Sequence, residues 1–260
     1  MKPILLALGL CGLLAPAVLA PGALADETVV AGLSQDRIDI TANFDGSDLL
    51  IYGAVKRLEP MPSTSRLEVI ITVEGPESSQ KVRRKSRRFG IWINTDAVVI
   101  DSAPSYYAIA TTAPFADIIA DTEDLRHSIS IPRAIRSVGA PQTVADSQTF
   151  TDALIRLREA KGLYSLHEGG VSLADQTLFR ADVDLPANLV EGNYKTRIFL
   201  LRDKAIVDLF ERTIYVRKVG LERWLFRLAH GQPAIYGALA LALAAFAGWA
   251  ASAAFRLMPT

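Results

Sequence analysis

The stretches Phe179-Arg-Ala-Asp-Val-Asp-Leu185 and Gly192-Asn-Tyr194 decide the fold that this sequence predicts. In the first stretch every second residue is apolar, which is typical of a β-strand with one buried face. In the second, a Gly-x-Tyr sequence opens an apolar strand, as at the tyrosine corner of immunoglobulin-like sandwiches, where the tyrosine hydroxyl binds upstream backbone. The chain lacks the Cys…Trp…Cys core of antibody domains. We therefore expect a mainly β fold, an immunoglobulin-like antiparallel sandwich without that core.

Strand patterns extend on both sides of these stretches. Residues 26–112 contain short apolar and alternating runs that end at Gly, Pro and Asp turn signals, and residues 163–218 repeat this pattern. The segment Arg202-Asp203-Lys204 predicts a turn between the last two strands. We expect two β-sandwich blocks, which form either two domains or one elaborated unit.

The intervening residues, 113–162, predict two short helices. The first begins at Pro114, and the apolar residues on one side of it are Phe115, Ile118, Ile119 and Leu125. The second covers Phe150–Lys161 and ends at Gly162, with Thr149 and Asp152 resembling a capping box. Its shared apolar face consists of Phe150, Leu154 and Leu157. Such stripes are typical of helices that pack on a core.

The first 25 residues have the order of a secretory signal peptide. A charge at Lys2 precedes an apolar run, and Ala23-Leu24-Ala25 supplies a cleavage site, so we expect 1–25 to be removed. The alternative is an uncleaved amino-terminal anchor. Cys11 is the one cysteine of the chain, so the processed protein would have no thiol for a disulfide, a metal site or a nucleophile.

The other end of the chain predicts a membrane span over residues 233–255, because that stretch is uncharged and forms roughly 34 Å of helix. Residues 219–232 predict an amphipathic juxtamembrane helix with arginines that can meet headgroups, and 256–260 form a short tail. A small-residue stripe follows one helix face: Ala240, Ala244, Gly248 and Ser252. It indicates helix pairing, or it arises by chance in a helix this rich in small residues.

The orientation of the span follows from the signal peptide. The cations before the helix, which include Arg217 and Arg223, would by themselves place that side in the cytoplasm. A cleaved signal overrides this preference, because a long translocated domain follows it. We expect the body in the periplasm and the tail in the cytoplasm of a single-pass inner-membrane protein.

A basic run stands out in the first block, and its cations are Arg83, Arg84, Lys85, Arg87 and Arg88. On a strand these side chains alternate between faces, which excludes a central position in a sheet and favours an edge, a hairpin tip or a loop. We expect the apolar segment Phe89–Ile93 to re-enter the core afterwards. Three interpretations stay open: a solvated edge that discourages strand pairing, a contact with anions or lipid headgroups, and a contact with an acidic protein.

The sequence carries no catalytic or cofactor motif, so we expect no enzymatic activity, cofactor or metal. His127, His167 and His230 are scattered without an evident carboxylate companion, and Glu123-Asp124 is expected to be a solvated pair. The 28 basic residues balance the 28 acidic ones, which argues against nucleic-acid binding.

Several segments together resemble a known family: Val82–Asn94, Pro104–Ala108, Leu185–Asn188, Glu191–Tyr194, Phe199–Asp203, Lys218–Glu222 and Tyr236-Gly237. They are similar to an alphaproteobacterial family of transmembrane proteins with a signal peptide and one carboxyl-terminal span. The resemblance implies no activity. Members are often encoded beside permeases of the sulfite-exporter type, which implies an accessory role.

Two functions are therefore expected. The first is a non-enzymatic inner-membrane protein whose periplasmic body contacts another membrane protein, such as a multi-span permease. The second is a module that binds sulfite, sulfate, phosphate or lipid headgroups through the basic run.

Overall fold

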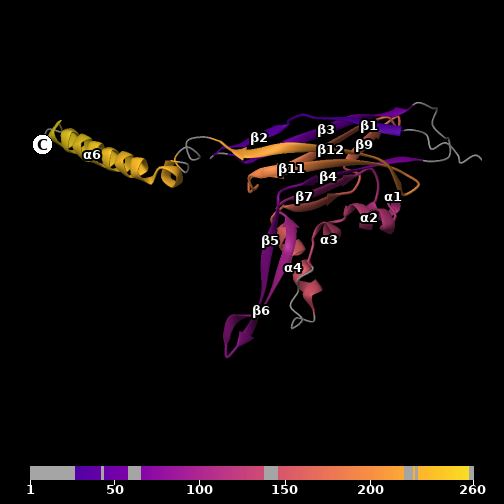
Figure 1. Cartoon of the computed structure of the whole chain (residues 1–260), viewed down its shortest axis with the longest axis horizontal. Helices are drawn as coiled ribbons and strands as arrows, with labels where there is room; N and C mark the ends of the chain where they lie inside the picture. The colour runs from indigo at the N-terminus through magenta and orange to yellow at the C-terminus, as the bar shows by residue number, and fades with distance from the viewer. Residues whose placement is uncertain are drawn as a thin grey trace, which may run out of the picture.

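The computed structural model describes residues 27–41, 44–57, 66–137, 146–219, 225 and 228–257, which form a β body and the helix α6 (Pro233–Leu257) (Figure 1). The strands are β1 (Glu27–Leu33), β2 (Arg37–Ile40), β3 (Gly46–Arg57), β4 (Leu67–Glu74), β5 (Glu77–Arg88), β6 (Ile91–Pro104), β7 (Tyr107–Thr111), β8 (Tyr164–His167), β9 (Val171–Ala174), β10 (Leu178–Pro186), β11 (Gly192–Arg202) and β12 (Ala205–Lys218). The predicted signal peptide and half of the predicted juxtamembrane helix lie outside the described residues.

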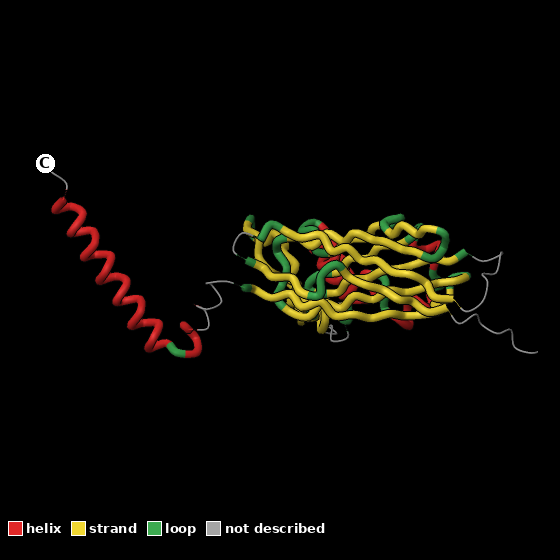
Figure 2. The backbone as a smooth tube through the Cα atoms, turned by 90° about the horizontal axis from the view of Figure 1, so that it is seen from above, coloured by secondary structure: helices red, strands yellow, loops and turns green. Residues whose placement is uncertain are grey.

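Two sheets make up the sandwich, and the expected mainly β fold is confirmed. One has the strand order β1-β3-β10-β9 and the other β2-β12-β11-β4-β7-β8. Their strands run lengthwise through the body (Figure 2). Apolar residues from both sheets, such as Ile51, Val183 and Phe199, belong to a single buried cluster. Burial of this cluster is the main force that holds the two sheets together.

The two predicted blocks share both sheets. Strand β3 of the first block pairs with β10 of the second, with Ile51 opposite Ala181, and β4 pairs with β11. The blocks are therefore built into one unit. The pairs β2–β12 and β7–β8 are parallel, whereas we expected antiparallel neighbours throughout. The pattern of side chains along one strand does not encode the direction of its neighbour.

The local predictions around β10 and β11 are confirmed. Phe179, Ala181, Val183 and Leu185 are all buried along β10. The Tyr194 hydroxyl donates to the backbone oxygen of Val190 over 2.9 Å, which is the predicted tyrosine-corner bond. The turn at Asp203 and Lys204 has positive φ at both residues, as a tight two-residue hairpin requires.

The described residues between the blocks form four short helices: α1 (Phe115–Ile118), α2 (Asp121–His127), α3 (Ile131–Ala134) and α4 (Ser147–Glu159). Ile118 and Ile119 are buried as expected, but Leu125 is exposed. The chain becomes extended at Ile119 and Ala120, so α2 starts a new helix and the predicted apolar face does not continue.

Helix α4 packs through Phe150 and Leu154, while Leu157 is exposed. The expected capping box is wrong. No side chain caps the helix at Asp146, and the Thr149 hydroxyl instead donates to the Asp146 backbone oxygen. After α4, Gly162 has a φ of +66°, a left-handed conformation that suits the predicted end of the helix.

Strands β5 and β6 form a separate two-stranded hairpin, called the arm below, which projects from the sandwich (Figure 1). Its turn is Phe89-Gly90, with positive φ at both residues. The prediction that Phe89–Ile93 re-enters the core is wrong, because Phe89, Ile91, Trp92 and Ile93 are exposed. Strand β6 reaches the body only further along, where Val98 and Ile100 are buried.

Among the described residues, one helix is long and apolar enough to cross a membrane. It covers the 21 residues Pro233–Ala253 of α6, which have a mean hydropathy of 1.8. None of its most apolar window is buried against the body. This helix corresponds to the predicted span 233–255.

Candidate functional site

The two faces of the arm have different surroundings. On β5, Val82, Arg84 and Ser86 are partly buried, whereas Lys81, Arg83, Lys85 and Arg87 are exposed. This alternation is the one expected of a strand. These four exposed cations are called the outer face below. The structure thus splits the predicted basic run: Arg84 lies on the packed face, and Arg88 lies beside the turn.

Arg84 fastens the arm to helix α4. Its Nη2 lies 2.6 Å from Asp146 Oδ2 and 2.7 Å from Thr149 Oγ1. Its guanidinium carbon also lies 4.5 Å from the centroid of the Phe150 ring. The hydrogen bond from Arg84 lowers the pKa of Asp146. Arg84, which is one of the predicted site residues, therefore stabilises the contact between the arm and α4.

The outer face presents its cations opposite uncharged residues of β6. The register pairs are Lys81–Val99, Arg83–Ala97, Lys85–Asn94 and Arg87–Trp92. Successive cations on one strand face are about 7 Å apart. This spacing suits several anionic groups spread over a surface better than one small anion.

The tip of the arm, Phe89–Ile93, is apolar apart from its glycine. Ile91 is 64% exposed and Trp92 is 68% exposed, and Phe89 at the turn is fully exposed. Large apolar side chains gathered at the end of a projecting hairpin indicate a contact surface. The outer face ends here, with Arg87 directly opposite Trp92.

The root of the arm lies at the end of the six-stranded sheet from which the chain leaves for α6. Glu74, the last residue of β4, pairs with Lys195, and Gly192 pairs with Val216 near the end of β12. Gly75 and Pro76 then lead into the arm. A Cβ on Gly192 would lie 2.8 Å from the Pro76 Cγ, so the two segments touch. The arm and the connection to α6 thus start at the same end of the body.

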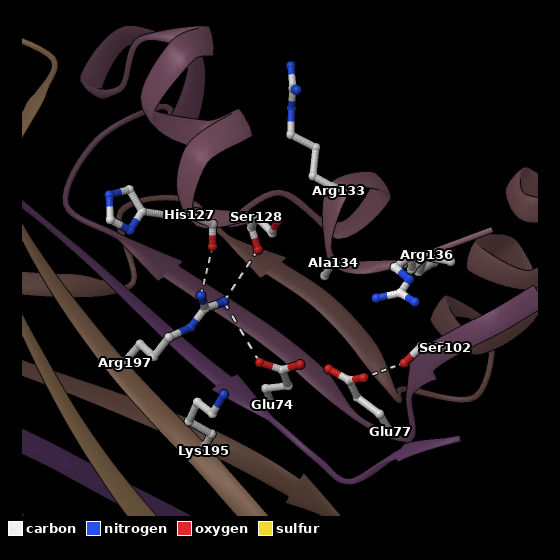
Figure 3. Close-up of a pocket in the computed structure, with 11 residues that line it drawn as sticks. Glu74, Glu77, Ser102, His127, Ser128, Arg133, Ala134, Arg136, Lys195 and Arg197 are labelled. Atoms are coloured by element: carbon white, nitrogen blue, oxygen red, sulfur yellow. Dashed lines mark hydrogen bonds and ion pairs between the residues drawn. The ribbon is translucent and has the colours of Figure 1, made fainter. Parts of the chain in front are cut away.

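A pocket of about 440 Å³ lies beside this root (Figure 3). No sequence pattern predicted it, because its residues come from distant segments. Arg197 donates from Nη1 to the backbone oxygen of His127 over 2.8 Å and from Nη2 to the Tyr107 hydroxyl over 3.1 Å. Its Nη2 also lies 3.8 Å from Glu74 Oε2. These bonds tie β11 to the end of α2, which indicates a structural role for Arg197.

The electrostatics of this pocket centre on Glu74. Burial raises the pKa of Glu74, the charge of Arg197 opposes this shift, and Glu77 adds to it through a hydrogen bond. Glu77 also accepts a hydrogen bond from the Ser102 hydroxyl. The pocket holds cations and carboxylates together, and Glu74 and Arg197 pair with each other across it.

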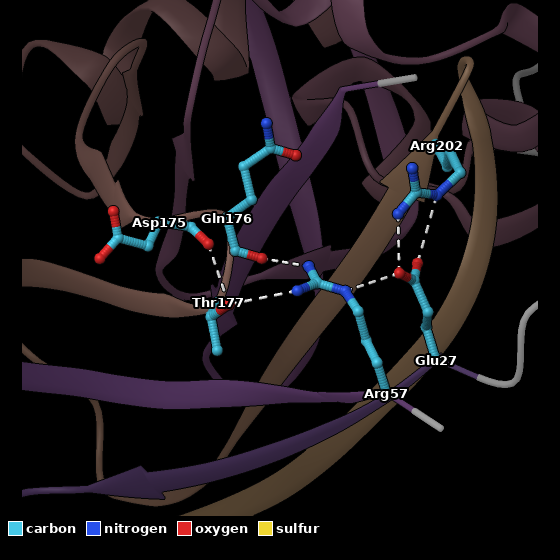
Figure 4. Close-up of polar contacts among 6 residues, drawn as sticks. All are labelled: Glu27, Arg57, Asp175, Gln176, Thr177 and Arg202. Carbon is cyan, nitrogen blue, oxygen red and sulfur yellow. Dashed lines mark hydrogen bonds and ion pairs between the residues drawn. The ribbon is translucent and has the colours of Figure 1, made fainter. Parts of the chain in front are cut away.

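A buried ion cluster joins the two sheets elsewhere (Figure 4). Glu27 Oε1 lies 2.7 Å from Arg57 Nε and 2.7 Å from Arg202 Nη2. Arg57 also donates to the Thr177 hydroxyl over 3.2 Å and to the backbone oxygen of Gln176. Both carboxylate oxygens of Glu27 accept hydrogen bonds from these two arginines, so we assign Glu27 a role in stability.

Two predictions about ionisable residues near α2 are wrong. His127 does have a carboxylate companion, because its Nε2 lies 3.7 Å from Glu123 Oε2 one helical turn away. Asp124 is buried, accepts from the backbone N–H groups of Ile129 and Ser130, and pairs with Arg133 at 2.8 Å. The i,i+4 spacing of Glu123 and His127 was the missed signal. In the described part of the chain, no three His, Cys, Asp or Glu residues gather as metal ligands do.

The predicted small-residue stripe lies along α6, and Ala240, Ala244, Gly248 and Ser252 are all exposed. A Cβ on Gly248 would meet no atom within 4 Å. This face is open to another helix.

A family model described as "Putative transmembrane protein (Alph_Pro_TM)" matches residues 28–257. The chain belongs to this family. The match covers the arm, both sheets and α6, so all the surfaces described above are parts of a transmembrane family protein. No curated protein matches the chain.

One solved structure is similar to this family member, the sporulation control protein Spo0M from Bacillus subtilis. The sequence identity is 8% and the TM-score is 0.30, with 80% of this chain and 56% of that chain covered. The chain thus spans little more than half of that structure. A likeness at this TM-score carries no argument about function.

Proposed function

We propose that the chain is a non-enzymatic, single-pass inner-membrane protein that acts as an accessory partner of a membrane transporter. Its β body works in the periplasm, and its short tail lies in the cytoplasm. The family and the apolar helix α6 support the membrane setting. A multi-span permease of the sulfite-exporter type is the proposed partner.

The observation that carries a binding role is the arm with its exposed tip. Monomeric soluble proteins rarely expose such a group of large apolar side chains, and those that do use it for contact with proteins or membranes. The arm starts where the chain leaves for α6, so it belongs to the end of the body tethered to the membrane. Within the membrane, the exposed stripe on α6 offers a face for a partner helix.

Co-purification from native membranes tests this role. The full chain, tagged after Thr260 and extracted in mild detergent, is expected to bring down one multi-span membrane protein. Gly248→Leu should reduce its recovery, because a leucine holds two helices apart. Ala242→Leu, on the opposite side of α6, is the matched control and should not. Recovery of the chain alone, or equal recovery with Gly248→Leu, would count against the proposal.

The second candidate is an anion-binding module, which the row of cations on the outer face favours. Calorimetry of the full chain in detergent with sulfite, sulfate and phosphate tests it. Combined Arg83→Gln, Lys85→Gln and Arg87→Gln substitutions should abolish the heat. Arg180→Gln, at an exposed ion pair on β10, should leave it unchanged. The absence of heat in the unsubstituted chain would exclude this candidate.

A further inference from the structure

We infer that the arm is a second membrane contact: its tip inserts into the surface of an anionic bilayer while the outer face binds lipid phosphates. This inference rests on the proposed function only in placing the body beside the membrane. It does not depend on a transporter.

The tip has the composition of an interfacial segment. Phe89, Ile91, Trp92 and Ile93 are exposed side by side around a tight turn. Aromatic residues, tryptophan above all, favour the boundary between headgroups and acyl chains. The tight turn at Phe89 and Gly90 has few backbone groups to bury. A shallow insertion of about 5–10 Å therefore removes the apolar side chains from water at a small desolvation cost for the backbone.

The charges continue from the tip in the order that a bilayer requires. Arg87 and Arg88 directly precede the turn, and Lys85, Arg83 and Lys81 follow at every second residue along one face. Uncharged residues lie opposite all four cations of the outer face. Each cation close to an anionic membrane surface is attracted to it, and a guanidinium group binds phosphate with two donors.

The dimensions of the arm agree with this contact. Strand β5 has 12 residues, which gives the arm a reach of roughly 40 Å. The arm is also braced, since Arg84 binds Asp146 and Thr149 of the α4 region and packs on Phe150. A braced arm loses little conformational freedom when its tip binds.

These features favour a bilayer over a protein partner. A protein-binding hairpin would be expected to combine its apolar residues with groups of both charges that fix a register. Here residues 85–94 contain cations and no acidic residue, and the apolar tip and these cations are arranged by distance along the arm, as acyl chains and headgroups are arranged by depth. The membrane helix of the same chain keeps the tip at high local concentration near a bilayer.

Fluorescence of Trp92 in the full chain tests the inference. The substitutions Trp224→Phe and Trp249→Phe leave Trp92 as the one tryptophan of the chain. The protein is reconstituted into vesicles of phosphatidylcholine and phosphatidylglycerol, with plain or brominated acyl chains. We expect a blue-shifted emission that brominated chains quench. The matched reporter, Tyr52→Trp with Trp92→Phe, lies on an exposed face of β3 and should show neither effect.

The charges are tested in the same vesicles. Combined Arg83→Gln, Lys85→Gln and Arg87→Gln substitutions should weaken the quenching of Trp92, as should vesicles of phosphatidylcholine alone. Equal emission of Trp92 in plain and brominated vesicles would overturn the inference. A photo-crosslinker at position 92 that captures one protein in native membranes, in a chain whose Trp92 is not quenched in vesicles, would also overturn it, because the tip would then bind protein. Because the vesicles contain no transporter, the quenching result does not bear on the accessory role, which co-purification tests separately.

Discussion

Glu27 shows how a single residue can close this fold. Its carboxylate is buried and meets Arg57 from the same sheet and Arg202 from the other sheet (Figure 4). Both arginines are themselves largely buried. Removing one partner of such a group leaves uncompensated buried charge, which is more costly than the ion pair is favourable.

Glu27→Gln is therefore expected to lower the free energy of unfolding by about 3 kcal/mol or more. The measurement is urea denaturation of the full chain in detergent, followed by the far-ultraviolet signal of the sheets. Asp182→Asn removes a carboxylate from the exposed pair with Arg180 and should cost about 0.5 kcal/mol or less. A similar loss for both variants would contradict the structural role of Glu27.

Glu74 makes the stability of the body depend on pH. Burial raises its pKa above the ordinary value of 4.5, so the protonated form is the better accommodated one in the folded state. Its stabilising contribution is complete below pH 4.5 and is lost as the pH rises through the raised pKa. The charged and titratable groups around it are Arg197, Lys195, Glu77 and Tyr107.

Glu74→Gln should flatten this fall in the free energy of unfolding between pH 4.5 and neutrality. Thermal unfolding at a series of pH values measures the effect, with Asp182→Asn as a control that keeps the fall. An unchanged pH profile in the Glu74→Gln protein would assign the fall to another group.

At the scale of elements, the bracing of the arm depends on a few contacts with α4. Phe150 is buried and supports the Arg84 guanidinium from below. Phe150→Leu keeps an apolar side chain but removes the ring, at a cost of about 1 kcal/mol. Amide exchange along β5 should then become several-fold faster, while β10 and β11 stay protected. Leu157→Ala, on the exposed side of α4, should leave exchange unchanged, and slow exchange in both variants would refute the bracing.

Strand β10 could be predicted from the sequence because its one buried face imposes an alternating pattern. The arm could not be placed in the same way. An apolar run such as Phe89–Ile93 has the same sequence pattern whether it packs in a core or lies on the surface. Which of the two occurs depends on the position of the hairpin relative to the sheets. The parallel pairing of β2 and β8 was not predicted either, because it joins segments that are distant in the sequence.

The candidate site was predicted in part. The alternation of Arg83, Lys85 and Arg87 followed from strand geometry. The engagement of Arg84 did not, because Asp146 lies 62 residues further along the chain. The same holds for Arg197 and the pocket beside the arm, which residues from several segments assemble.

At the scale of the whole molecule, α6 sets the relation of the body to the membrane. The proposed orientation predicts that alkaline phosphatase fused after Val219 is active and that a fluorescent protein fused after Thr260 is fluorescent. The physical reason is that phosphatase needs the disulfides of an oxidising compartment, whereas the tail is expected to remain in the cytoplasm. An inactive phosphatase with a fluorescent fusion at Val219 would reverse the orientation.

The pairing of strands from distant segments also determines when the body can fold during synthesis. Strand β2 has β12 as its described sheet neighbour, and Glu27 meets Arg202 across a separation of 175 residues. A nascent chain therefore cannot complete the ion cluster until Arg202 at the end of β11 has been synthesised, and it cannot complete the parallel pair until β12 follows. Until then the early strands present open edges that invite aggregation. The body thus reaches its finished state only when synthesis has almost arrived at α6, so folding and anchoring become nearly simultaneous events.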